Sequence, residues 1–144
     1  MIVLLVLFGA LLFFRLLGVA GVDLFATWVA SARAALAAML AFTSLAHFGS
    51  MKKDLVAMVP PGLPRPDLLV GATGAAELLG AAGLLIPPAR FWAASGLILL
   101  FISMLPANVS AVRRGVLLRG RRATPLWLRV PMQLLFIIWA FLVR

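Results

Sequence analysis

The feature that most constrains this chain is a 20-residue apolar stretch from Asp67 to Ile86 with a single carboxylate, Glu77, close to its middle. A helix rises about 1.5 Å per residue, so this stretch would be roughly 30 Å long, the thickness of a bilayer's hydrocarbon core. Glu77 would then lie near the midplane, where a charge costs at least a few kcal/mol. We therefore expect Glu77 to be protonated, paired with a cation, or turned into the protein interior.

The composition indicates an integral helical membrane protein with one bundle. Of the 144 residues, 65% are hydrophobic and only 12% are charged, and the mean hydropathy is +1.15. Cysteine is absent and there is one histidine, so thiolate metal sites, iron–sulfur clusters and disulfides are excluded and no metal site is expected. The net charge of +9 gathers between apolar runs, which predicts contacts with lipid headgroups and no nucleic-acid partner.

Five apolar runs predict an all-α, polytopic bundle that forms a single membrane domain over residues 1–144. The expected spans are residues 1–21, 28–48, 67–86, 91–106 and 127–143. The prolines between Pro60 and Pro66 cannot continue a helix, and Leu55–Val59 is expected to form a short interfacial turn. Residues 107–126 are expected to form a polar loop, and no strand pattern competes with these assignments.

Basic residues predict the orientation of the bundle. The loops after the second and fourth spans hold eight of them: Lys52, Lys53, Arg65, Arg113, Arg114, Arg119, Arg121 and Arg122. The opposite side holds Arg90 and Arg144. Because positive loops stay in the cytoplasm, we expect a bacterial-type inner membrane, with the N-terminus in and the C-terminus out.

One face of the second span carries a polar stripe. Its members, spaced by three and four residues, are Arg33, Ala37, Leu40, Ser44 and His47. Arg15 and Arg33 lie near the outer side, where each could either snorkel to water or neutralise Glu77. The sequence leaves both alternatives open.

Small and polar residues share the face of Glu77, among them Thr73 and Gly74, which allows a neighbouring helix or ligand to approach closely. We expect a pocket enclosed by the second to fifth spans, floored by Glu77, with His47, Asn108 and Gln133 at its inner mouth. The candidate ligand-binding residues are His47, Glu77, Asn108, Gln133, Arg33, Ser44 and Thr73. Four of them have a structural alternative: Glu77 as a protonated or arginine-paired structural residue, His47 bonded to backbone at a helix end, and Asn108 and Gln133 as interhelical contacts.

Five segments together resemble the DoxX-like membrane protein family. They are Ala46-His47-Phe48, residues 58–64, residues 74–85 around Glu77, Leu105-Pro106-Ala107-Asn108, and residues 127–133. The resemblance covers about residues 28–143 and implies a four-helix core from the second to fifth spans, with the first span as an addition. It also implies His47, Glu77 and Asn108 as a polar signature, with Gln133 weaker. A link to the membrane subunit of a thiosulfate:quinone oxidoreductase makes quinone a candidate cofactor.

The leading functional hypothesis is a bundle that binds a lipophilic small molecule, a quinone or isoprenoid lipid, as a candidate membrane subunit of an oxidoreductase system. In this hypothesis Glu77 and His47 hydrogen-bond the ligand's polar head or exchange protons with it. The first alternative is a non-catalytic anchor or assembly subunit in which Glu77 is structural. The second is a small-molecule transporter, which the absence of paired inverted repeats disfavours. Expected partners are membrane lipids and either a partner protein or a second copy of the chain.

Overall fold

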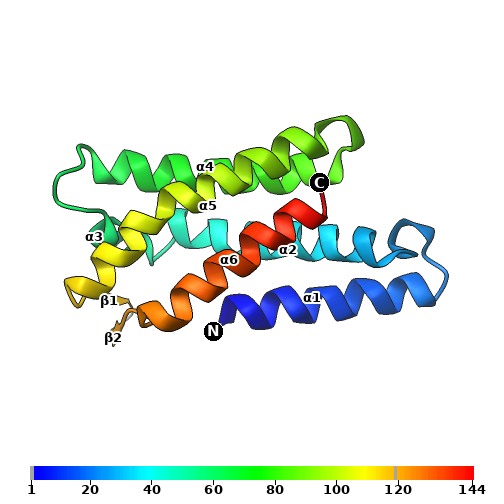
Figure 1. Ribbon diagram of the computed structural model, residues 1–144, viewed down its shortest axis with the longest axis horizontal. Helices are drawn as coiled ribbons and strands as arrows, with labels where there is room; N and C mark the ends of the chain where they lie inside the picture. The colour runs from blue at the N-terminus through cyan, green and yellow to red at the C-terminus, as the bar shows by residue number, and fades with distance from the viewer. Residues whose placement is uncertain (1, 119) are drawn as a thin grey trace.

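The computed structural model describes residues 2–118 and 120–144, which form six α-helices and one small hairpin (Figure 1). The helices are α1 Ile2–Val19, α2 Trp28–Phe48, α3 Lys52–Met58, α4 Pro66–Leu85, α5 Arg90–Arg113 and α6 Leu126–Leu142. Short 3₁₀ turns at Asp23–Phe25 and Pro87–Ala89 precede α2 and α5. The expected all-α architecture is confirmed, while Met1 of the first expected span lies outside the described residues.

Four of the helices, α1, α2, α4 and α5, are long and apolar enough to cross a membrane. The last helix, α6, is also apolar but has 17 residues, which is at the lower limit of about 17 for a spanning helix. The fold is therefore compatible with a membrane protein, and the four-helix core implied by the DoxX-like resemblance is not confirmed.

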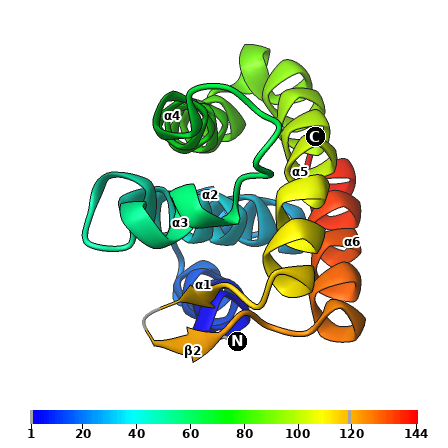
Figure 2. The same cartoon turned by 90° about the vertical axis from the view of Figure 1, so that its left-hand side faces the viewer.

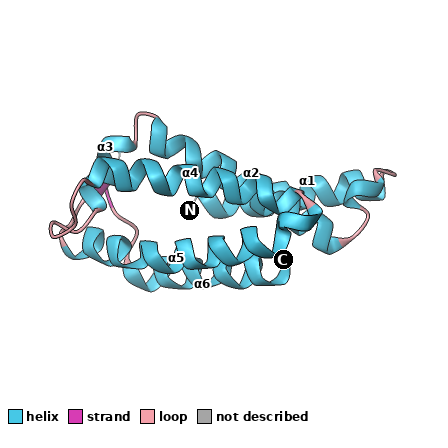
Figure 3. Ribbon diagram, turned by 90° about the horizontal axis from the view of Figure 1, so that it is seen from above, coloured by secondary structure: helices cyan, strands magenta, loops and turns pink. Residues whose placement is uncertain are grey.

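The long helices form two layers, with α1, α2 and α4 in one and α5 and α6 in the other (Figures 2 and 3). Helix α2 packs along α4 and α1, α4 packs on α5, and α5 on α6. The layers are joined by Trp139, whose Nε1 donates to Ala32 O at 3.0 Å and whose ring meets that of Phe8 edge-on at 5.7 Å. Fully buried leucines fill the space between the layers: Leu7, Leu36, Leu40, Leu84 and Leu97.

Local sequence signals explain several helix ends. The Thr27 side chain caps α2 by accepting a hydrogen bond from Ala30 N at 3.1 Å. Pro66 begins α4 at a position where its missing N–H is no loss. Between α2 and α4 the expected interfacial turn is instead a helix, α3, and the proline-rich segment that follows it is not helical.

The fourth span differs from the prediction, which ended it at Pro106. Helix α5 continues through Pro106 to Arg113, although this proline cannot donate to Ile102 O. Inside a bundle, neighbouring groups compensate for one missing bond, so proline does not end the helix.

The expected loop is correspondingly shorter than predicted, and it contains a short hairpin that the sequence pattern did not indicate. Strands β1 (Leu117–Leu118) and β2 (Arg121–Arg122) pair antiparallel, and the turn between them holds Gly120 at φ +74°. Arg119 lies outside the described residues.

Candidate functional site

Glu77 lies in the middle of α4 and faces α2, with only 5% of its surface exposed. The Thr43 hydroxyl on α2 donates to Glu77 Oε2 at 2.9 Å, and His47 Nδ1 lies 3.9 Å from the same oxygen. The structure therefore shows the third of the expected arrangements, a carboxyl group turned into the protein interior. Thr43 was missed by the sequence analysis, although it stands four residues before His47 and so on the same side of the helix.

Neither of the two candidate arginines reaches Glu77. Arg15 Nη1 donates to Ala26 O at 2.8 Å, and Arg33 Nε donates to Val143 O at 2.9 Å. The Arg15 guanidinium also lies over the Trp28 ring, 5.0 Å from its centroid. Within the described part of the chain, His47 is thus the one basic side chain within 4 Å of Glu77.

His47 sits near the C-terminal end of α2 and is 5% exposed. Its Nδ1 is 3.3 Å from Thr43 O, which can only accept a hydrogen bond, so we place the ring proton on Nδ1. In a neutral imidazole Nε2 is then an acceptor, and it has no hydrogen-bond partner among the described residues. The backbone-bonded alternative therefore accounts for one nitrogen of His47 and leaves the other available.

His47 lines a partly open cavity of about 630 Å³ whose walls come from α2, α3, α4, α5 and the loop that follows α3. Its other polar side chains are Thr73, Ser103 and Asn108, and the rest of the wall consists mostly of apolar side chains such as Leu55, Met58 and Leu69. A volume within about 300–1,000 Å³, apolar walls and a few polar groups are typical of sites for small lipophilic molecules.

The expected single pocket is not formed by all seven candidate residues. His47, Thr73 and Asn108 line the cavity, whereas Glu77 lies behind His47 and is not in the wall. Ser44, also outside the wall, donates its hydroxyl to Gly74 O at 2.9 Å and so joins α2 to α4. The Thr73 hydroxyl donates to Val70 O of its own helix at 2.9 Å, so its lone pairs remain available to a ligand.

Asn108 and Gln133 meet where α5 packs on α6. Asn108 Nδ2 donates to Gln133 Oε1 at 3.4 Å, and Gln133 Nε2 donates to Phe101 O at 2.6 Å. Arg129, which the sequence analysis did not single out, donates from Nη1 to Asn108 Oδ1 at 2.6 Å. These contacts match the interhelical alternative for Gln133, while Asn108 contributes both to this network and to the cavity wall.

Arg114 is a second residue that the sequence analysis did not place at the site, because its charge suggested membrane orientation and contacts with lipid headgroups. Its Nη2 donates to the carbonyls of Ala57, Met58 and Val59 at 2.8, 3.0 and 2.9 Å. These carbonyls end α3, which forms one wall of the cavity, and a cation is favourable at a helix C-terminus. Arg114 therefore fixes the position of that wall.

Within the described residues no three histidine, cysteine or carboxylate side chains come together where they could hold a metal ion. The polar atoms of the cavity wall can hydrogen-bond a ligand: an acceptor at His47 Nε2, the lone pairs of Thr73 and the second amide proton of Asn108.

Comparison with known proteins identifies one family for this chain and overturns the DoxX-like resemblance. No curated protein and no solved structure matches the chain. One family model matches residues 36–144, from within α2 to the C-terminal end, and leaves α1 outside. It is not the DoxX-like family, so that resemblance was wrong: its segments combine small, apolar and proline residues, which recur widely in packed membrane helices. The chain belongs to the family described as Domain of unknown function (DUF8561).

Proposed function

We propose that this protein binds a lipophilic small molecule with a hydroxyl-bearing head in the cavity between α2, α3, α4 and α5. The observation that carries the proposal is the position of His47, which places an acceptor without a protein partner at the wall of an otherwise apolar cavity. Because Nε2 is accessible at the cavity wall, a ligand that donates to it would gain a hydrogen bond worth about 1 kcal/mol.

The polar atoms of the wall favour a head that carries O–H groups. His47 Nε2 and the Thr73 oxygen accept, and the second amide proton of Asn108 donates. An isoprenoid alcohol, or the reduced quinol form of a quinone, would satisfy both kinds of group. A quinone, which presents carbonyl oxygens only, would leave His47 without a donor.

In this proposal Glu77 supports the site rather than touching the ligand. Its carboxyl group bonds Thr43 and lies beside His47, so it fixes one turn of α2 against α4. The Thr43 hydroxyl is also 3.1 Å from Leu40 O but has only one proton to give. A protonated Glu77 that donates to Thr43 would satisfy both contacts and avoid a buried charge.

A non-catalytic anchor or assembly subunit is the second candidate. It is favoured by the bonds that Glu77 makes to Thr43 and that Gln133 makes to α5, because these join helices whether or not a ligand is present. This candidate predicts that the cavity holds only bulk membrane lipid.

For the membrane itself we propose the cytoplasmic membrane of a bacterial cell, with the N-terminus inside and the C-terminus outside. Support comes from the basic residues near α3 and the hairpin, which lie together at one end of the bundle (Figure 1). Reporter enzymes fused to the C-terminus and to the α3 loop would test this orientation, because each reporter is active on only one side of the membrane.

The test of ligand binding is native mass spectrometry of the mildly solubilised protein, followed by organic extraction of what stays bound. The variants His47→Leu and Thr73→Phe remove the acceptor and fill the cavity, and Ala75→Phe is a control that adds bulk at an exposed position of α4 outside the cavity wall. We expect one stoichiometric hydroxyl-bearing lipophile in the wild type and the control, and its loss in the two cavity variants. Bulk phospholipid alone in all four proteins would contradict the proposal and favour the anchor candidate.

A further inference from the structure

A second cavity, of about 550 Å³, lies between α1, α2 and α4 near the start of α2. Most of its lining is apolar, and its two charged residues are Arg33 of α2 and Arg90 of α5. The lining of this cavity on α2 ends at Ala41, six positions and about 9 Å along the helix before His47, and the two cavities share no lining residue. This cavity is therefore separate from the one proposed above.

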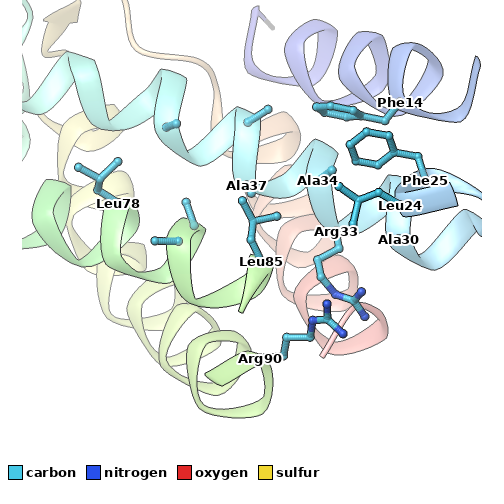
Figure 4. A pocket seen from close by; sticks show the side chains of 14 residues that line it. Phe14, Leu24, Phe25, Ala30, Arg33, Ala34, Ala37, Leu78, Leu85 and Arg90 are labelled. Carbon is cyan, nitrogen blue, oxygen red and sulfur yellow. The ribbon is translucent and has the colours of Figure 1, made fainter. Parts of the chain in front are cut away.

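The two arginines converge without a counter-charge. Figure 4 shows their guanidinium groups side by side at one end of the cavity, where the charge of Arg90 acts on Arg33. Arg33 Nε donates to Val143 O and Arg90 Nε donates to Leu84 O at 3.3 Å, so backbone carbonyls fix both side chains. No carboxylate in the described part of the chain forms an ion pair with either of them.

This arrangement leaves the terminal nitrogens of both guanidiniums available to one ligand. Backbone contacts occupy only the Nε atoms, and the planar fork of arginine suits the oxygens of a phosphate or carboxylate. Because two adjacent positive charges repel one another, an anion between them relieves that repulsion.

Beyond the arginines the cavity continues as a groove of small side chains. On α2 these run from Ala34 to Ala41, about 10 Å along the helix, and on α4 Ala81 and Ala82 face them. The groove thus leads from the charged end towards the middle of the membrane. It has the length and apolar character to hold an alkyl chain.

We propose that this second cavity binds an anionic membrane amphiphile, with its phosphate or carboxylate head held between Arg33 and Arg90 and its tail in the alanine-lined groove. The occupant is a lipid and not a free anion, because the same cavity that holds the two arginines extends into a groove with apolar walls, which a free anion would leave empty. This inference does not depend on the ligand proposed for the His47 cavity.

The test is native mass spectrometry of the full chain in non-ionic detergent with three probes. Dodecyl phosphate supplies head and tail, inorganic phosphate supplies the head alone, and methyl dodecanoate supplies a tail without charge or O–H. We expect one dodecyl phosphate to bind the wild type at least tenfold more tightly than either of the other probes. Equal binding of inorganic phosphate would show a free-anion site, and equal binding of methyl dodecanoate would show an uncharged groove; either overturns the proposal.

Substitutions test whether the two arginines bind the head group of dodecyl phosphate. The double variant Arg33→Gln/Arg90→Gln is expected to lose at least tenfold in affinity for dodecyl phosphate, while Arg65→Gln/Arg113→Gln, with the same charge loss at exposed positions, is expected to keep it. If the double variant does not fold, the single variant Arg90→Gln tests whether an arginine binds the anionic head group. Ala82→Trp fills the groove proposed for the tail, and it is expected to lower the affinity for dodecyl phosphate by a similar factor. An equal loss in the Arg65/Arg113 control, or unchanged binding to Ala82→Trp, would overturn the proposal.

Discussion

Gly74 of α4 lies directly against His47 of α2: a Cβ atom at position 74 would stand 2.5 Å from His47 Cβ and 2.8 Å from Cγ. Real side chains do not approach so closely, so the imidazole keeps its place at the cavity wall only because residue 74 has no side chain. The neighbouring Ser44–Gly74 hydrogen bond holds the same turn of the two helices together.

We predict that Gly74→Ala lowers the free energy of unfolding by about 1–3 kcal/mol, because the added methyl group must push α2 away from α4. It should also weaken ligand retention, since His47 moves with α2. Thermal unfolding in detergent measures the first effect and native mass spectrometry the second.

The control for that variant is Gly71→Ala on the same helix, where an added Cβ meets nothing within 4 Å. Alanine there is expected to leave stability unchanged or raise it by up to about 1 kcal/mol, through helix propensity alone. Equal destabilisation by the two substitutions would show that the contact with His47 is not tight.

The bond between Thr43 and Glu77 predicts an asymmetry between two substitutions. Thr43→Val leaves a buried carboxyl group without its partner and is expected to lower the free energy of unfolding by about 1–3 kcal/mol. Glu77→Gln keeps an amide that can donate to Thr43 and should lower it by less than about 1 kcal/mol.

If Glu77 is protonated, the wild type should show a carboxylic-acid C=O band in the infrared that Glu77→Gln lacks. A spectrum unchanged by Glu77→Gln would contradict a neutral Glu77.

Arg114 should control the mobility of α3. Arg114→Gln removes the donor shared by three carbonyls at the end of that helix, so hydrogen–deuterium exchange over residues 52–64 should become faster. Arg113→Gln removes the same charge from an exposed neighbour and should leave exchange in this segment unchanged. Similar acceleration by both variants would mean that charge, and not the specific contact, stabilises α3.

Gln133 is predicted to contribute to the packing of α6 on α5. Gln133→Leu removes bonds to Phe101 O and Asn108 and should lower the free energy of unfolding by about 1–3 kcal/mol. Thr73→Val, whose hydroxyl bonds only within its own helix, should change it by less than about 0.5 kcal/mol. Chemical unfolding of the two variants in mixed micelles provides the comparison, and a Thr73→Val effect as large as that of Gln133→Leu would contradict it.

The sequence predicted well what depends on length and periodicity. The run around Glu77 is a helix, and the proline-rich segment before it breaks the chain as expected. What it could not predict depends on helix rotation: Glu77 bonds Thr43 instead of an arginine, and Gln133 faces α5 instead of the cavity. Those outcomes depend on how each helix is rotated against its neighbours, and the sequence pattern of a single helix does not determine that rotation.

The measurement that tests the central claim most directly compares the binding of farnesol and farnesyl methyl ether to the purified protein. The two probes share an isoprenoid chain, but only farnesol has an O–H to donate to His47 Nε2. We predict that the wild type binds farnesol about fivefold more tightly, as expected for a hydrogen bond worth about 1 kcal/mol, and that His47→Leu abolishes the difference. Equal binding of the two probes to the wild type, or a preference that persists in His47→Leu, would contradict the account.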